Sequence, residues 1–267
     1  MNVVLGERVA ARLIDQRISP SRIRQIPNWA NGAQIWPIEH VTNPLRASWN
    51  LSTKFVVGYS GNLGRAHEID TLLGAISALE TPSSSALTSP RQIVWLFIGG
   101  GALTGRLKAE VEHRGLKSVM FQPYQSRARL AESLSVADVH LVSLRPVLEG
   151  LIVPSKIYGV AAAGRPAIFI GDSDGEVARI LARHYCGLTV PMNEFAALAD
   201  AILDLARQPD RCRRLGRNAR AVFEASFDLP KAVEAWEGLL GEVCAAGANA
   251  AELYRSALRA PLTKNVE

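Results

Sequence analysis

The feature that most constrains the fold is a regular alternation of two patterns that begins at Lys54. Short runs rich in Val, Ile, Leu and Phe, typical of strands buried on both faces, are each followed by a stretch with helical periodicity. The predicted strands are Phe55–Tyr59, Ile93–Ile98, Val119–Phe121, Val139–Ser143, Ala167–Ile170 and Leu188–Val190. This alternation predicts an α/β fold in which a Rossmann-like parallel sheet carries helices on both faces.

Other segments flank or interrupt this region. Residues 1–50 contain strand patterns at Val3–Leu5 and Ile23–Ile26, a helix pattern from Glu7 to Gln16, and an irregular connector from Pro37 to Asn50. We interpret them as the end of a preceding domain and its linker, so Val3–Leu5 is expected to lack neighbouring strands. The alternating domain spans residues 51–243, the stretch Thr81–Pro90 predicts a surface loop, and residues 244–267 form an Ala-rich tail.

Composition excludes several classes of protein. Of the 267 residues, 48% are hydrophobic and 21% charged, as in globular domains. The three cysteines show no CxxC spacing and the five histidines no HxxxH spacing, so we expect neither a disulfide framework nor a metal site. No signal peptide is visible and no apolar run approaches the ~20 residues of a spanning helix. The sequence therefore predicts a cytoplasmic protein, at most peripheral at the inner face of the membrane.

The net charge of +5 leaves phosphates and anionic membrane surfaces open as partners. Part of the excess is a cluster of arginines at helical spacing, formed by Arg211, Arg213, Arg214, Arg217 and Arg220. We interpret this arginine cluster as a solvated helix face rather than a nucleic-acid or membrane patch, and no nucleic-acid partner is predicted.

Ligands of an open parallel sheet bind at the carboxyl ends of its strands, so the segments that follow the strands carry the candidate site. The first strand is followed by Ser60-Gly61-Asn62-Leu63-Gly64-Arg65-Ala66-His67. Its glycines allow backbone to approach a ligand closely, and the next helix is expected to point its N-terminus at the ligand, which suits a phosphate. Arg65 and His67 would add positive charge. The alternative is a tight turn with solvated side chains.

The second predicted strand is followed by Gly99-Gly100-Gly101-Ala102-Leu103-Thr104-Gly105, which matches the spacing GxGxxxG. A dinucleotide site of this type needs an acidic residue about 20 positions further on, where it holds the ribose. The next strand instead ends in Phe121-Gln122-Pro123-Tyr124. An NAD-dependent oxidoreductase is therefore disfavoured.

A further helix is predicted to begin near Pro154 and Ser155, after the fourth strand. Ser155 would cap this helix and leave backbone N–H groups free. Lys156, in the first turn, opposes the helix dipole unless an anion lies opposite it. Such a local inconsistency is expected at functional sites, so Lys156 is a candidate phosphate ligand. The alternative is a lysine that points to solvent.

Six short motifs occur along the chain: Gly58–Gly64, Phe97–Gly101, Ala137–Val139, Pro154–Tyr158, Ala162–Pro166 and Asp174–Glu176. Together they resemble the group 1 (family 4) glycosyltransferases of the GT-B fold, especially those of colanic-acid and O-antigen biosynthesis. The resemblance implies that residues 51–243 are the C-terminal, donor-binding half of a GT-B fold, and that residues 1–50 end the acceptor-binding half.

The resemblance also implies an activity. A hexosyl or N-acetylhexosaminyl unit would pass from a UDP- or GDP-sugar co-substrate to a saccharide or lipid-diphosphate acceptor. Retention of configuration is implied, without a metal or other cofactor. The alternative is a truncated nucleotide-binding module that is inactive alone or needs a separate acceptor-domain chain.

The resemblance assigns roles by position. Donor-binding residues would be Ser60, Gly61, Asn62, Gly64, His67, Gly99, Gly100, Pro154 and Ser155, with Tyr124 beside the nucleotide base. Arg65 and Lys156 would neutralise the departing diphosphate. The family usually has arginine where Asn62 stands and lysine where His67 stands. Its paired glutamates would fall at Leu151 and Gly159, so Glu149 is the candidate for contact with the ribose.

Overall fold

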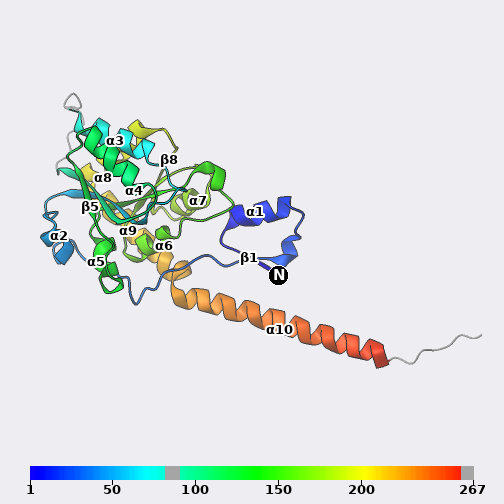
Figure 1. Cartoon of the computed structure of the whole chain (residues 1–267). Helices are drawn as coiled ribbons and strands as arrows, with labels where there is room; N and C mark the ends of the chain where they lie inside the picture. The colour runs from blue at the N-terminus through cyan, green and yellow to red at the C-terminus, as the bar shows by residue number, and fades with distance from the viewer. Residues whose placement is uncertain (82–90, 260–267) are drawn as a thin grey trace, which may run out of the picture.

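The computed structural model describes residues 1–81 and 91–259, with side chains as far as residue 245, and it confirms the predicted α/β fold. The main sheet has six parallel strands in the order β5-β4-β3-β6-β7-β8 (Figure 1). Their bounds are β3 (Phe55–Asn62), β4 (Ile93–Gly100), β5 (Val119–Gln122), β6 (Val139–Ser143), β7 (Ala167–Ile170) and β8 (Gly187–Val190). The winding direction reverses between β3 and β6, so the crevice expected to hold a ligand lies at the carboxyl ends of these two strands.

Successive residues of each strand point to opposite sides of the sheet, and because the strands are almost continuously apolar, both faces are apolar. Helices cover both faces. They are α3 (Asp70–Glu80), α4 (Thr104–His113), α5 (Leu130–Ser135), α6 (Lys156–Ala162), α7 (Glu176–Arg183), α8 (Phe195–Arg207) and α9 (Pro209–Val222). Val57 and Trp95 pack in a core with α3 and α8, whereas Val142 and Phe169 pack with α6 and α7. Both layers are buried, which explains the almost continuous apolar runs of the strands.

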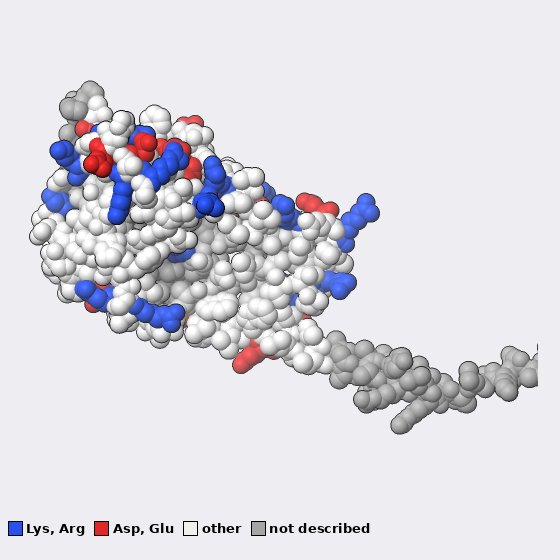
Figure 2. Space-filling view, in the orientation of Figure 1, with Lys and Arg blue, Asp and Glu red and all other residues white. Residues whose placement is uncertain are grey.

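Charged side chains of both signs gather over α3 and α4 on the face drawn in Figure 2. Arg106 pairs with Asp70 there, and Arg114 pairs with Glu110 one helical turn away. No helix within residues 1–81 and 91–259 combines the length and apolar character that crossing a membrane requires.

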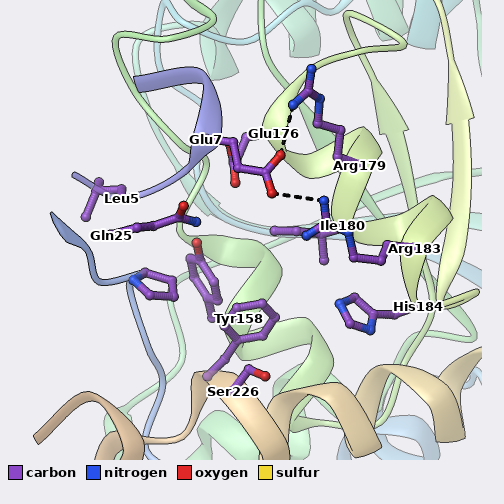
Figure 3. A pocket seen from close by; sticks show the side chains of 12 residues that line it. Leu5, Glu7, Gln25, Tyr158, Glu176, Arg179, Ile180, Arg183, His184 and Ser226 are labelled. Atoms are coloured by element: carbon purple, nitrogen blue, oxygen red, sulfur yellow. Dashed lines mark hydrogen bonds and ion pairs between the residues drawn. The ribbon is translucent and has the colours of Figure 1, made fainter. Parts of the chain in front are cut away.

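The first segment of the chain is a small βαβ unit, made of β1 (Asn2–Val4), α1 (Glu7–Asp15) and β2 (Ile23–Gln25). The prediction that Val3–Leu5 lacks a neighbouring strand is wrong, because the chain returns after α1 and β1 pairs with β2 in parallel. The unit docks on α7. Glu7 forms ion pairs with Arg179 and Arg183, each at 2.9 Å (Figure 3). The Arg8 backbone N–H donates to the Glu176 carboxylate at 3.1 Å.

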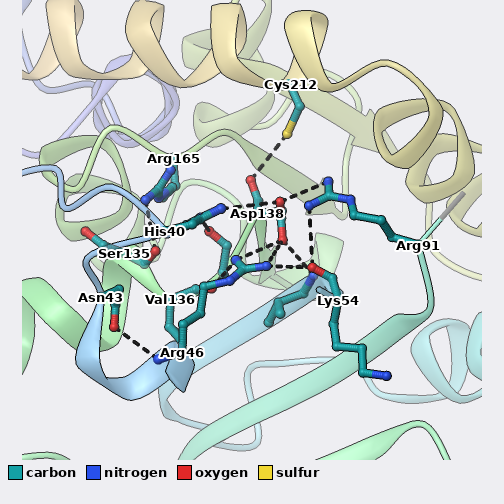
Figure 4. A network of polar contacts seen from close by, with 12 residues as sticks. His40, Asn43, Arg46, Lys54, Arg91, Ser135, Val136, Asp138, Arg165 and Cys212 are labelled. Atoms are coloured by element: carbon teal, nitrogen blue, oxygen red, sulfur yellow. Dashed lines mark hydrogen bonds and ion pairs between the residues drawn. The ribbon is translucent and has the colours of Figure 1, made fainter. Parts of the chain in front are cut away.

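The predicted irregular connector contains a short helix, α2 (Pro44–Ser48), so the prediction is wrong at these residues. Asn43 caps α2 with its side chain and Pro44 occupies the first turn, a combination that starts helices. Arg46 projects from α2 into the domain, where only 1% of it is exposed. Both of its terminal nitrogens donate to Asp138 Oδ2 at 3.1 Å (Figure 4).

The end of the described chain is α10 (Leu229–Arg259), which projects away from the sheet (Figure 1). It begins after Asp228, whose carboxylate accepts a hydrogen bond from the Leu229 N–H at 2.8 Å. The predicted tail from residue 244 is therefore helical as far as Arg259. Residues 260–267 lie outside the described residues, as do residues 82–90 of the predicted surface loop.

Candidate functional site

The centre of the candidate site is formed by the ends of β3 and β4. Gly61 pairs with Gly99, and Asn62 pairs with Gly100. The sequence suggested that these residues and Ser60 follow the strands as loops, whereas in the structure they are the ends of β3 and β4. A side-chain carbon at Gly99, whose φ is +119°, would lie 2.6 Å from the Gly61 carbonyl oxygen. Glycine is therefore required there, and it leaves backbone without side chains at the edge of the crevice.

Tyr124 follows β5 and lies beside these glycines. Its hydroxyl donates to the Gly100 carbonyl oxygen at 3.4 Å, and 60% of the residue is exposed. An exposed aromatic ring held at the mouth of a crevice is suited to stack on a flat ring system. The structure thus brings Tyr124, Gly99 and Gly100 together, and contact with a nucleotide base stays a prediction.

Lys156 starts α6, and its ammonium group lies against Tyr59 on the neighbouring strand β3. The Lys156 Nζ atom is 3.6 Å from the centre of the Tyr59 ring and also donates to the Tyr59 hydroxyl. The alternative of a lysine that points to solvent is wrong, because the switch in strand order places the start of α6 beside the end of β3. Burial lowers the pKa of Lys156 to about 7. An anion bound nearby would restore its full charge.

Pro154 and Ser155 precede Lys156 and differ in exposure. Pro154 is buried and Ser155 is exposed. Ser155 already has helical dihedral angles, φ −64° and ψ −19°, and its side chain makes no capping hydrogen bond. The prediction that Ser155 caps α6 is therefore wrong, since a capping side chain needs an extended backbone to reach the first N–H groups.

His67 ties the segment after β3 to the end of β6. Its Nδ1 atom lies 2.7 Å from the Ser143 carbonyl oxygen, to which it donates, and its ring meets the Tyr59 ring edge-on. Burial, with a smaller contribution from the Lys156 charge, lowers the pKa of His67 to about 4. The prediction that His67 adds positive charge is therefore wrong at neutral pH. Arg65 is exposed and makes no bond to the described residues, so it remains an available cation.

The N-terminus of α3 was predicted to point at a ligand, but its first N–H groups are bonded to a side chain of the protein itself. The Glu68 carboxylate accepts from the Thr71 N–H at 2.9 Å and from the Asp70 N–H. Glu68 is buried, so its carboxylate occupies the donors that a phosphate would need. Gly64 lies before this turn, next to the side-chain amide of Asn62.

Glu149 lies on the far side of β6, against the start of α7. Its Oε2 atom accepts from the Glu176 N–H at 3.3 Å, whereas Oε1 is buried and has no partner among the described residues. Burial raises the pKa of this carboxyl group. No hydrogen bond or ion pair among the described residues joins Glu149 to Lys156, Tyr59 or His67, and contact with the ribose stays a prediction.

Sequence reasoning missed Tyr59, which links most of the residues above. Its ring contacts Lys156, His67 and Phe97, and its hydroxyl donates to the Asn62 carbonyl oxygen at 2.9 Å. The only signal was a polar aromatic residue at the end of the otherwise apolar predicted strand Phe55–Tyr59. The side chains described here include no group of three His, Cys, Asp or Glu arranged to hold a metal ion.

A doubly wound parallel sheet with a crevice at its switch point is the architecture of the Rossmann-like α/β domains. A profile described as "Glycosyl transferases group 1" matches residues 42–222. The chain therefore belongs to the group 1 glycosyl transferase family, as the motifs predicted.

Two curated relatives illustrate the kinship. The chain is 30% identical over 228 residues to "Probable glycosyltransferase WbjE" of Pseudomonas aeruginosa, covering 84% of this chain and 54% of the relative. It is 24% identical to "Putative colanic acid biosynthesis glycosyl transferase WcaI" of Escherichia coli, covering 63% and 40%. The chain thus spans about half the length of these relatives or less.

Solved structures share the fold. Sucrose-phosphate synthase from Thermosynechococcus elongatus superposes with a TM-score of 0.72 at 25% identity, over 91% of this chain and 59% of that one. Anabaena HepE in complex with UDP and glucose also gives 0.72, at 15% identity, over 91% and 62%. These likenesses confirm the prediction that the main sheet is one half of a GT-B fold.

Proposed function

We propose that residues 51–243 bind a nucleoside diphosphate sugar and form the donor side of a retaining, metal-independent glycosyl transfer. The observation that carries this proposal is the ammonium group of Lys156 at the carboxyl ends of β3 and β6. Burial lowers the pKa of Lys156, its ammonium group lies against Tyr59, and no carboxylate of the described residues forms an ion pair with it. A buried cation without an anion at a ligand crevice is suited to bind one.

The chemistry of glycosyl transfer matches these residues. When the bond between the sugar and the diphosphate breaks, negative charge develops on the departing diphosphate, and fixed cations stabilise it. Lys156 and the exposed Arg65 would supply that charge, and the bare backbone at Gly61 and Gly99 gives the phosphates room. Tyr124 would stack on the base. The UDP bound by the similar fold of HepE supports a uridine nucleotide, with GDP as the other choice.

The acceptor is a separate part of the proposal. The proposed acceptor is a saccharide or a lipid diphosphate; one relative is named for colanic-acid biosynthesis, and another, of Escherichia coli, is named "O-antigen chain mannosyltransferase C". The chain spans about half the length of these relatives or less. The part of the site that binds the acceptor would therefore lie outside residues 51–243 or belong to a separate chain. A lipid acceptor would bring the protein to the inner face of the membrane. Single-turnover assays with labelled UDP- and GDP-sugars distinguish a transferring enzyme from a module that only binds nucleotide.

The binding proposal is tested by thermal denaturation with UDP, GDP and ADP, each with and without EDTA. At least one nucleotide is expected to raise the melting temperature, since a ligand that binds only the native state stabilises it. The shift should persist with EDTA because the proposed contacts to phosphate are side-chain cations. No shift with any nucleotide, or a shift abolished by EDTA, would contradict the proposal.

Binding of the donor should depend on the protonation of Lys156. With a pKa of about 7 in the free protein, Lys156 is charged below pH 7 and largely neutral above it. A bound diphosphate raises this pKa, so binding takes up a proton and the affinity should fall by up to about tenfold per pH unit above 7. Titration of a UDP-sugar between pH 6 and 9 measures the slope, and a Lys156→Arg variant should flatten it. If the affinity of the parent protein does not change with pH, Lys156 does not contact the diphosphate.

A further inference from the structure

A cavity of about 550 Å³ lies at the opposite edge of the main sheet from the Lys156 crevice. Its lining includes Arg91, Asp138 and Pro166, which precede β4, β6 and β7, so it opens at the amino-terminal ends of these strands. The connector from Pro37 to Val41 forms one wall, and α9 forms the other. The volume falls within the range of small-molecule sites.

Basic side chains outnumber acidic ones around this amino-edge cavity. Its arginines are Arg91, Arg165, Arg213, Arg217 and Arg220, and its carboxylates are Glu39, Asp138 and Glu224. The Asp138 carboxylate is already paired with Arg46 and Arg91, and that of Glu224 with Arg220. The remaining carboxylate, Glu39, is exposed at the rim and makes no ion pair with the described residues.

Three guanidinium groups are left for a ligand. Arg217 makes no hydrogen bond or ion pair with the described residues, and Arg213 pairs with Asp210, an exposed residue that is not part of the lining. Both belong to the arginine cluster that the sequence suggested was a solvated face. Their side chains are indeed exposed, but the structure aligns them with Arg165 along one cavity.

Arg165 is the third and most buried of these groups (Figure 4). Its Nη2 atom donates to the carbonyl oxygens of Ile38, at 2.6 Å, and Ser135, at 2.9 Å, while its Nε atom is buried without a partner. No carboxylate in the described part of the chain lies within ion-pair distance of it, and burial lowers its pKa. The charges of Asp138 and Glu39 act on Arg165 from beyond ion-pair distance and offset part of the cost of burying it, and an anion in the cavity would offset more of that cost.

The walls of the cavity are preformed. Gly164, with φ +63°, packs so closely on the connector that a side-chain carbon would lie 3.0 Å from Pro37 Cγ. A side-chain carbon at Gly216 in α9 would lie 2.4 Å from the Gly164 carbonyl oxygen. Connector, loop and helix are therefore in direct contact at these glycines. The backbone around the cavity is therefore fixed before a ligand binds, and Arg165 is also held by its two carbonyl partners.

We propose that the amino-edge cavity is a second ligand site that takes a phosphate-bearing organic anion. Arg165, Arg213 and Arg217 hold the phosphate, because the planar guanidinium fork matches its oxygens. The organic part lies against the apolar lining, which includes Pro37, Pro166 and Cys212. A phosphate of this kind occurs in soluble sugar and glycerol phosphates and in the headgroups of anionic phospholipids.

The test uses the full chain and two probes. Calorimetry measures binding of glycerol 3-phosphate, and co-sedimentation measures binding to phosphatidylcholine vesicles with and without phosphatidylglycerol. The variant Arg213→Ala/Arg217→Ala should weaken binding of the effective probe about tenfold or more. Arg214→Ala is the matched control, since Arg214 is an exposed arginine of the same helix that does not line the cavity.

The outcomes separate this inference from the proposed function. Binding of glycerol 3-phosphate identifies a soluble ligand, and binding of the anionic vesicles alone identifies a headgroup, provided that the double variant reduces it. Lys156→Ala should leave either signal unchanged. The inference is overturned if neither probe binds, or if the double variant binds like the parent. It is also overturned if only Lys156→Ala abolishes binding, a result that would place the phosphate in the donor crevice and leave the proposed function intact.

Discussion

Replacing Asp138 by alanine is expected to lower the free energy of unfolding by about 3–5 kcal/mol, the loss typical when one partner of a buried ion pair is removed. The Asp138 carboxylate accepts from both terminal nitrogens of Arg46 at 3.1 Å and from the Val56 N–H at 2.8 Å. It also pairs with Arg91 at 3.2 Å. Arg46 would remain buried with its carbonyl partners but without a counter-charge. The packing of α2 against the sheet would be weakened as a result.

Urea denaturation followed by circular dichroism measures this loss. Asp210→Ala is the control, because Asp210 pairs with Arg213 on the surface of α9, where such pairs contribute little. Adding Arg46→Met to Asp138→Ala should recover part of the stability, since no unpaired buried charge then remains. A loss no greater than that of the control would show that this buried pair does not anchor the connector.

The sequence predicted the sheet best where the strands are uniformly apolar. Val139–Ser143 and Ala167–Ile170 begin and end as predicted, because both are buried on two faces. The ends of β3 and β4 were missed, since Gly61 and Gly99 pair through backbone alone and carry no hydrophobic signal. The strand patterns at Val3–Leu5 and Ile23–Ile26 were predicted, but the pairing of β1 with β2 was missed, because the sequence of a strand does not specify its partner.

The candidate site shows the same division. Lys156 could be predicted because a lysine in the first turn of a helix is a local inconsistency. The contacts that decide how it acts join residues far apart in the chain, such as Lys156 with Tyr59 or His67 with Ser143. Neither pair leaves a periodic signal. Charge states were equally hidden, because the lowered pKa of His67 arises from burial in the folded protein.

Lys156→Ala is expected to weaken binding of UDP or GDP by roughly 10- to 150-fold, since a charge-assisted contact to phosphate contributes about 1.5–3 kcal/mol. Binding of uridine or guanosine should change little, because neither carries the phosphates that Lys156 would contact. Arg65→Ala should act in the same direction but more weakly, since Arg65 is exposed and its charge is screened by solvent. Isothermal titration with nucleotide and nucleoside, at a pH below 7 where Lys156 is charged, measures both effects.

A matched control separates phosphate binding from loss of a lysine packed on an aromatic ring. Lys108 lies over Phe121, with its Nζ atom 5.3 Å from the ring centre, on the exposed surface of α4. Lys108→Ala should bind UDP like the parent protein, whereas Lys156→Ala should not. If Lys156→Ala and Arg65→Ala both bind nucleotide as the parent does, the diphosphate must be held elsewhere. The buried ammonium group against Tyr59 would then be a structural contact and not the anion site of the crevice.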